Sequence, residues 1–210
     1  MGVLTDNAGR RVKLLKAKNQ SLRYLSGEEI EKLIGAASPY FKPMIRLAVN
    51  TGLRRGEILG LQWKAVNLKA GTIELLDQKN GEVSYVPLNA EAVKAVRSVP
   101  RRLDSPFVFC LATGEPPCNF GRAFAAIVER AEIPTCTFHA LRHTFASHLA
   151  MSGVDILTIQ KLMRHKTLTM TLRYSHLADQ HVRKAVEHLT FKKTEENEPK
   201  RANQVRKTHA

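Results

Sequence analysis

Cysteines are few in this chain, and long apolar runs are missing. Cys110, Cys118 and Cys136 are its only cysteines and form no C-x-x-C pair, so the sequence indicates neither a disulfide framework nor a cysteine zinc site. No segment approaches the roughly twenty apolar residues of a membrane span, and no apolar run follows the basic N-terminus. We therefore expect a cytoplasmic protein that does not enter the membrane and is not secreted.

Acidic residues are scarce in the part of the chain that holds most of the histidines. Between residues 133 and 176 the only acid is Asp155, and this leaves too few carboxylates for a Mg²⁺ site or a two-metal nuclease. His139 and His143 have the spacing of an H-E-x-x-H zinc site, but Ala140 occupies the position of the glutamate base. The sequence therefore favours chemistry that needs neither a metal nor another cofactor.

Basic residues, in contrast, are abundant. The 210-residue chain has 33 lysines and arginines against 19 aspartates and glutamates, which gives a net charge of +14. This excess indicates a polyanionic partner, either nucleic acid or an anionic membrane surface. Because 43% of the residues are apolar, the chain can also bury the core of one compact domain.

Charge and apolar periodicity divide the chain into four segments. Residues 1–20 are basic and lack periodicity, as expected of a lead-in or linker, and residues 21–180 carry the regular patterns of a folded domain. Residues 181–190 predict an amphipathic helix, which packs either on its own domain or on a neighbouring protomer. Residues 191–210 are basic and nearly free of apolar side chains, a composition typical of a disordered tail.

Within the folded segment, helix caps and helical periodicity predict mainly helices. Ser26 and Glu29 form a capping box at the start of a helix over residues 27–37, and Pro43 suits the first turn of a second helix. Further helices are expected over about residues 57–63, 90–99, 120–131, 137–152, 156–163 and 167–174.

Two strands are predicted around Asn80-Gly81, a dipeptide typical of tight hairpin turns. They span residues 71–76 and 83–87, so the expected fold is mainly α with a small antiparallel β-sheet, an α+β arrangement. Lys79 lies at the tip of this hairpin. A lysine there either enters a neighbouring groove and donates a proton or simply improves solubility.

Two arginines lie where the chain can present them to an anion. Arg142 follows His139 by three residues near a helix start, so both side chains lie on one face beside free backbone N–H groups. Arg54 follows the end of a predicted helix, with Glu57 in place to orient its guanidinium and Arg55 as a competing candidate. For His139 and Arg142, the alternative is that they form a solvated basic face of the helix. For Arg54, the alternative is that it interacts with the dipole of the preceding helix.

The segment from Gly153 to His176 has two interpretations. Its short apolar helices and basic turn resemble a helix-turn-helix that contacts DNA phosphates without chemistry. Alternatively, Tyr174 is a nucleophile for a phosphodiester and His165 is a ligand of the phosphate. Considered alone, Tyr174 would more often be an amphipathic packing residue.

Taken together, three segments resemble the boxes of the tyrosine site-specific recombinases, the phage-integrase family. They are Thr51–Leu61, Phe138–Ala146 with its H-x-x-R pair, and Leu162–His176 with R-Y-x-H. The resemblance covers roughly residues 21–180. It implies a catalytic domain of this fold that cleaves and rejoins double-stranded DNA through a 3′-phosphotyrosyl link. It also implies that neither metal nor ATP is needed and that a homo-tetramer assembles on the DNA.

The resemblance also assigns roles to individual residues. The positions that match the family's site residues are Arg54, Lys79, His139, Arg142, His165 and the nucleophile Tyr174. Among them, His139 is expected to accept the tyrosine proton, Lys79 to protonate the leaving 5′-oxygen and His165 to hydrogen-bond the phosphate. Lys69 is a second candidate for the lysine.

The chain departs from the family pattern in two places. Arg164 precedes the histidine where the family usually has glycine, and only the basic segment 1–20 stands where members usually carry an N-terminal core-binding domain. We therefore expect an isolated catalytic domain that binds DNA weakly. Two other functions stay open: a type IB topoisomerase-like relaxase, which reseals the original strand, and a DNA-binding module without catalysis.

Overall fold

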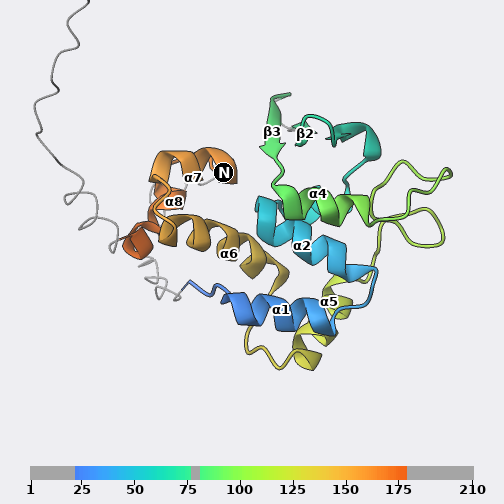
Figure 1. Cartoon of the computed structure of the whole chain (residues 1–210), viewed down its shortest axis with the longest axis horizontal. Coiled ribbons are helices and arrows are strands. Elements are labelled where there is room, and N and C mark those ends of the chain that lie inside the picture. Colours follow the sequence, from blue (N-terminus) through green and yellow to red (C-terminus); the bar gives the residue numbers. More distant parts are fainter. Residues whose placement is uncertain (1–21, 77–80, 179–210) are drawn as a thin grey trace, which may run out of the picture.

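The computed structural model describes residues 22–76 and 81–178, which form a helical body with a small sheet at one edge (Figure 1). The α-helices are α1 (Gly27–Ala36), α2 (Phe41–Thr51), α3 (Arg55–Leu59), α4 (Ala90–Arg97), α5 (Phe120–Arg130), α6 (Phe138–Met151), α7 (Ile156–Met163) and α8 (Thr169–Leu172). The short 3-10 helices are η2 (Trp63–Ala65) and η3 (Ser175–Ala178). The strands are β1 (Val66–Asn67), β2 (Thr72–Leu76) and β3 (Val83–Pro87). The predicted α+β class is therefore confirmed.

Several helices begin where the sequence provides a side-chain cap. Ser26 Oγ accepts the N–H of Glu29, and the Glu29 carboxylate accepts the N–H of Ser26, so the capping box of α1 is formed. Thr137 caps α6 and Asp155 caps α7 through their side-chain oxygens. Gly52 ends α2 with a left-handed φ of 61°, a conformation that glycine adopts without steric cost.

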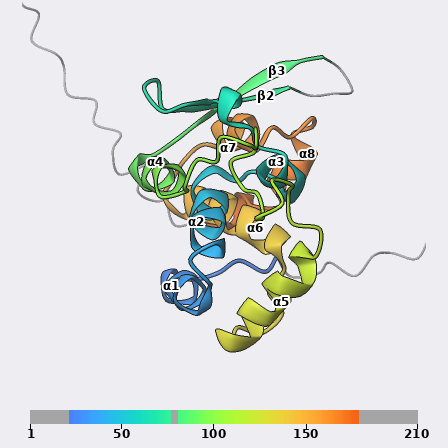
Figure 2. The ribbon, with the colours of Figure 1, turned by 90° about the vertical axis from the view of Figure 1, so that its right-hand side faces the viewer.

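The sheet is antiparallel with the order β1-β2-β3, and the β2–β3 hairpin stands out from the helices (Figure 2). Ile73 pairs with Val86, and both side chains are buried. Tyr85 on the opposite face is exposed, so the strands alternate between core and solvent as in a half-buried sheet. Both predicted strands are confirmed. Strand β1 was not predicted, and it is only two residues long.

Among the described residues, two hydrophobic clusters form the interior, and α6 passes through both. The larger cluster packs α1, α2, α5 and the start of α6, and the rings of Phe120, Phe124 and Phe138 meet in it with centroids between 4.8 and 6.3 Å apart. The smaller cluster packs the second half of α6 against α7 and includes the fully buried Tyr174. Figure 1 shows α6 crossing the body from the α5 side to α7 and α8. The candidate nucleophile is therefore anchored to the main core through α6.

Two predicted helices are shorter than expected. The helix expected over residues 167–174 is limited to α8, which has four residues. The helix expected over residues 57–63 corresponds to α3, which already ends at Leu59, and the chain then becomes extended. There Gln62 forms an antiparallel β-bridge with Phe107. Pairing with a distant loop thus prevails over local helix propensity once Gly60 has interrupted the helix.

Several predictions concern residues outside the described ranges. The basic segment 1–20, the helix at 181–190, the tail at 191–210 and Lys79 all lie there. Among the helices of the described ranges, none combines the length and the apolar character needed to cross a bilayer.

Gly52 offers a test of the junction between α2 and α6. A Cβ at this position would lie 2.5 Å from Cδ1 of Phe145 and 3.2 Å from Sδ of Met163, on a backbone with positive φ. We expect Gly52→Ala to lower the free energy of unfolding by about 2–4 kcal/mol, because steric overlap adds to backbone strain. Urea denaturation at equilibrium measures this difference.

Gly35→Ala is the matched control. Gly35 is exposed in α1, and no atom lies near its Cβ position, so alanine should raise stability by about 0.5–1 kcal/mol. Equal effects of the two substitutions would contradict the packing described for Gly52.

Candidate active site

Arg142 is the buried centre of the candidate site. It lies on α6 with 3% of its surface exposed, and its Nη1 and Nη2 donate to the carbonyl oxygens of Gly52 and Met163. These bonds join the end of α2 to the end of α7. Burial, followed by the charges of Arg54 and Arg164, lowers the pKa of Arg142 to about 10, so the guanidinium stays charged at neutral pH.

Arg54 stands at the rim of the same site. Its backbone N–H donates to Oε2 of Glu57 at 2.7 Å, and its Nη1 donates to Oε1 at 2.8 Å. Its Nη2 donates to the carbonyl of Arg164 at 3.3 Å. The Arg54 side chain is 45% exposed, so a guanidinium held by protein groups still faces solvent. An anion can therefore reach it.

Arg164 follows α7 and contacts both Arg54 and Glu57. Its φ of 52° is left-handed, a conformation that costs a residue other than glycine about 1–2 kcal/mol. Its Nη2 donates to Oε2 of Glu57 at 2.8 Å, and its Nη1 donates to the carbonyl of Leu162 at 3.0 Å. The arginine that departs from the family pattern is thus engaged with the site.

His165 comes next in the chain and is held by a buried threonine. Its Nδ1 lies 2.9 Å from Oγ1 of Thr171, which is fully buried. Burial, then the charges of Arg142 and Arg54, lowers the pKa of His165 to about 4. The ring is therefore neutral at physiological pH. In the tautomer that accepts the threonine proton at Nδ1, its Nε2–H can donate to a phosphate oxygen.

Tyr174 contacts His143, a residue that the sequence suggested only as a metal ligand. The tyrosine hydroxyl lies 2.6 Å from Nδ1 of His143. Burial, then His139 and Arg173, lowers the pKa of His143 to about 4. Burial raises the pKa of Tyr174, an effect that Arg173 and Arg142 oppose. A neutral imidazole thus faces a protonated phenol.

His139 lies beside this pair at the protein surface. Its ring packs edge-to-face on that of His143 with centroids 4.6 Å apart. Partial cover of the imidazole, then the charges of Arg142 and Arg54, lowers the pKa of His139. His139 therefore borders the same cationic region, while the nitrogen that hydrogen-bonds the tyrosine hydroxyl belongs to His143.

The structure brings five of the six predicted residues into one region, and the sixth, Lys79, lies outside the described ranges. The contribution of His143 was not predicted. It follows His139 by four residues and so shares its helix face, but its partner Tyr174 lies 31 positions away. No local pattern reports a contact over that separation.

A metal site is not apparent in this part of the molecule. Within residues 22–76 and 81–178, no group of three or more His, Cys, Asp or Glu side chains is placed to hold a metal ion. Nδ1 of His143, one of the two histidines of the H-x-x-x-H pair, is engaged by the tyrosine hydroxyl.

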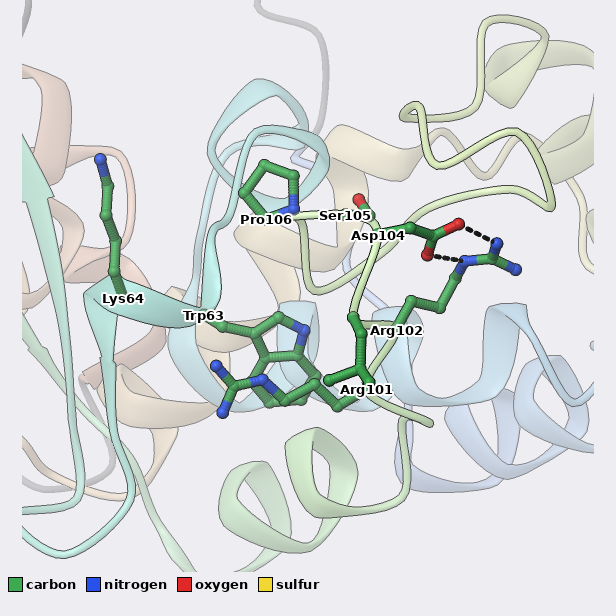
Figure 3. Close-up of a pocket in the computed structure, with 8 residues that line it drawn as sticks. Trp63, Lys64, Arg101, Arg102, Asp104, Ser105 and Pro106 are labelled. Atoms are coloured by element: carbon green, nitrogen blue, oxygen red, sulfur yellow. Dashed lines mark hydrogen bonds and ion pairs between the residues drawn. The ribbon is translucent and has the colours of Figure 1, made fainter.

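A separate pocket lies beside the loop that follows α4 (Figure 3). It has a volume of about 460 Å³ and is lined by Trp63, Lys64 and residues 101–106. Arg101 lies over the Trp63 ring, 5.6 Å from its centroid, and Arg102 pairs with Asp104. None of the predicted site residues lines this pocket, so we do not assign the chemistry to it.

Comparison with known proteins identifies the family. Residues 23–181 match the phage integrase family. The chain is 33% identical over 205 residues to the tyrosine recombinase XerD of Caulobacter vibrioides, covering 86% of this chain and 66% of that protein. Its fold resembles the catalytic domain of bacteriophage HP1 integrase, with a TM-score of 0.63, 29% identity, and coverage of 80% of this chain and 95% of that one.

A third similar structure is the Tn1549 transposon integrase in complex with transposon right end DNA, with a TM-score of 0.68 and 25% identity. The match covers 83% of this chain and 68% of that one. The chain belongs to the phage integrase family, and its fold is that of a tyrosine recombinase catalytic domain. It spans 48% of the Salmonella phage P22 integrase and 66% of XerD, about half to two thirds of these curated relatives.

The lowered histidine pKa values should make stability depend on pH. An unfolded histidine titrates near pH 6.5, whereas the folded-state pKa values of His143 and His165 are about 4. The unfolded chain therefore binds more protons, and stability falls as pH drops from about 6.5 to 4, by up to about 1.4 kcal/mol per pH unit for each histidine. We expect His143→Gln and His165→Gln each to flatten this decline in urea denaturation. If the stability of both variants falls with decreasing pH as steeply as that of the wild type, the lowered pKa values of His143 and His165 are contradicted.

Proposed function

We propose that this chain is the catalytic domain of a site-specific DNA recombinase that cleaves and rejoins DNA through a 3′-phosphotyrosyl intermediate. The observation that carries the proposal is the contact of Tyr174 with the neutral His143 beside fixed guanidinium groups. A phenol, a proton acceptor and a group of cations are what an attack on a phosphodiester needs. Family membership and the similar fold of a DNA-bound transposon integrase support it.

The guanidinium groups address the main obstacle to this reaction, which is charge. A phosphodiester repels nucleophiles, and its transition state places further negative charge on the non-bridging oxygens. Arg54 and Arg142 would neutralise this charge, and the loss of one such donor costs about 10²–10³ in rate. The net charge of +14 also favours association with the DNA backbone.

We infer that His143, rather than His139, accepts the proton of Tyr174. As the phenolic oxygen bonds to phosphorus, its O–H bond breaks and the proton moves to Nδ1 of His143. At the same time the bond from phosphorus to the 5′-oxygen breaks, and that oxygen takes a proton from Lys79. The 2.6 Å separation supports the first transfer. Because the phosphotyrosyl link conserves the diester energy, a 5′-hydroxyl from another strand can reverse the step without ATP.

Burial of Tyr174 adds a conformational step. The residue is fully buried, so a diester cannot reach its hydroxyl in this arrangement. The neighbouring α8 has only four residues, and its side chains Met170 and Leu172 are 43% and 47% exposed. A short and weakly packed element moves at low free-energy cost. We propose that DNA binding shifts it and admits the phosphate.

Two other functions were open from the sequence. The helix-turn-helix alternative loses support because α8, its would-be recognition helix, has four residues, about one turn. A type IB topoisomerase-like relaxase would use the same chemistry. Strand exchange between two differently marked duplexes distinguishes recombination from relaxation.

We further propose that the chain acts in the cytoplasm on double-stranded DNA as a homo-tetramer. Each protomer supplies one tyrosine, and exchange between two duplexes requires cleavage of all four strands. In a cyclic tetramer each protomer contacts the next through two different surfaces. We propose that the segment after Ala178 provides one of these surfaces. If its deletion leaves DNA-dependent assembly unchanged, that role is wrong.

Tyr174→Phe should abolish covalent attachment to DNA and preserve DNA binding, because the ring keeps its packing and loses only the hydroxyl. The assay uses a pool of nicked duplexes of randomised sequence, from which the short 5′-hydroxyl strand diffuses away after cleavage and leaves the adduct trapped. Sequencing the attached strands also reports the preferred target. An adduct formed by the phenylalanine variant would overturn the nucleophile assignment. Loss of wild-type cleavage in EDTA would overturn the metal-free mechanism.

A change of the leaving group distinguishes the role of His143 as proton acceptor from the role of Lys79 as proton donor. His143→Gln should lower the single-turnover cleavage rate by about 10²–10⁴, both on ordinary DNA and on DNA with sulfur in place of the scissile 5′-oxygen. A thiolate leaves without protonation, so Lys79→Ala should regain activity on the sulfur substrate.

His139→Gln is the matched control for the neighbouring histidine. We expect it to retain more activity than His143→Gln on the sulfur substrate, where only proton acceptance is needed. The reverse order would return the acceptor role to His139.

A further inference from the structure

Arg164 occupies a backbone conformation that arginine rarely adopts. It is the left-handed residue that ends α7, with φ 52° and ψ 46°. Glycine adopts this conformation without steric cost, and helices commonly end on it for that reason. An arginine here needs an explanation from its side chain, because the backbone alone would favour glycine.

The Arg164 side chain turns inward and contacts the site. It is 12% exposed, and its Nη2 donates to Oε2 of Glu57 at 2.8 Å. Burial lowers the pKa of Arg164, while the charge of Glu57 opposes that effect. The guanidinium is therefore held by a carboxylate in a largely covered position, where an ion pair is stronger than at the surface.

Arg164, Glu57 and Arg54 form a closed ring of hydrogen bonds. Arg54 Nη1 donates to Glu57 Oε1 at 2.8 Å, Arg164 Nη2 donates to Glu57 Oε2, and Arg54 Nη2 donates to the Arg164 carbonyl at 3.3 Å. Both ends of Arg164, its carbonyl and its guanidinium, thus belong to the ring. If the Arg164 guanidinium were lost, Glu57 would keep only Arg54 as a partner in the ring.

The turn that contains Arg164 also supports the other site groups. The carbonyl of the preceding Met163 accepts from buried Arg142, and the following residue is His165, whose ring nitrogen meets Thr171. A shift of this turn would therefore move the Arg142 anchor and the His165 ring together. Displacements of about 1 Å in such groups can change a reaction rate by about 10².

We propose that Arg164 is a positioning residue for DNA cleavage, which acts through Glu57 to hold Arg54 and the Met163–His165 turn in the reactive arrangement. This inference rests on the proposed recombinase function. Arg164 is not a DNA contact in this scheme, because it is largely covered and both of its terminal nitrogens already have protein acceptors. It also does not serve merely to end the helix, since glycine would do so with less strain.

The test compares stability with rate for Arg164→Gly. Glycine relieves the left-handed strain but also removes the ion pair with Glu57, and because these two effects oppose each other the melting temperature should change by no more than a few degrees. The single-turnover rate of covalent adduct formation at saturating DNA should fall about 10- to 100-fold. Losses of this size are typical for residues that do not contact the ligand themselves but hydrogen-bond the side chains that do. The DNA is the sequence best trapped by the wild type from the randomised nicked pool. Affinity, measured by fluorescence anisotropy, should change less than about threefold, with an unaltered salt slope.

Glu132→Gly is the matched control. Glu132 is exposed and also left-handed, with φ 55°, but it lies on the loop after α5, away from the ring. It should gain stability through the same relief of backbone strain, with an unchanged cleavage rate.

A double-mutant cycle tests whether Arg164 acts through Glu57. Glu57→Gln should also slow cleavage, and the double variant Arg164→Gly with Glu57→Gln should be little slower than the worse single variant, because both remove the same link. Arg164→Lys keeps the charge and the strained backbone, and it should recover part of the rate.

The possible outcomes separate this inference from the proposed function. If the wild type forms no covalent adduct, the recombinase function itself fails. If the wild type forms the adduct and Arg164→Gly does so at an equal rate, the positioning role is wrong. A weaker affinity of Arg164→Gly for DNA, with a salt slope smaller by about one, would instead make Arg164 a phosphate contact. Fully additive effects of Arg164→Gly and Glu57→Gln on the cleavage rate would show that Arg164 does not act through Glu57.

Discussion

A buried guanidinium holds the candidate site together. Arg142 donates to the carbonyls of Gly52 and Met163, which lie at the C-terminal ends of α2 and α7. Carbonyls at a helix end lack intrahelical partners, and the negative end of each helix dipole favours a cation. Burying a charge is costly unless it is hydrogen-bonded. The helix ends therefore stabilise the arginine, and the arginine joins the helices that carry the site.

Burial and the neighbouring positive charges keep the histidines of the site in their neutral, proton-accepting form. Burial and the charges of nearby arginines and a neighbouring histidine keep the pKa values of His143 and His165 about 4, so both rings are neutral before DNA arrives. A phosphodiester brings negative charge that opposes these shifts. Substrate binding would thus increase the proton affinity of His143 at the moment when Tyr174 needs an acceptor. Phosphate recognition and nucleophile activation depend on one electrostatic environment.

The position of Tyr174 reflects a compromise between stability and reactivity. Its ring completes the small cluster formed by α6 and α7, and burial of an aromatic ring contributes about 1.5–3 kcal/mol. The same burial shields the hydroxyl from solvent and from DNA. The four-residue α8 next to it supplies an element that can move while the main core, around Phe120 and Phe138, stays intact.

Much of the secondary structure and the composition of the site follow from local sequence. Ser26 with Glu29, Thr137 and Asp155 mark helix starts through contacts within three residues, and Asn80-Gly81 marks the hairpin. The order of Arg54, Arg142, His165 and Tyr174 indicates the family. The caps and the turn can be predicted because the atoms that form them are close along the chain.

Tertiary packing alone decided the remaining features. The extended course of the chain beyond α3 depends on the bridge of Gln62 to Phe107 in a distant loop. The choice of His143 as the partner of Tyr174, and the ring that joins Arg164 to Arg54 through Glu57, depend on contacts between segments more than thirty residues apart. Contacts of this kind are set by how helices pack and by which buried polar groups must find partners. Those conditions exist only once the chain has folded.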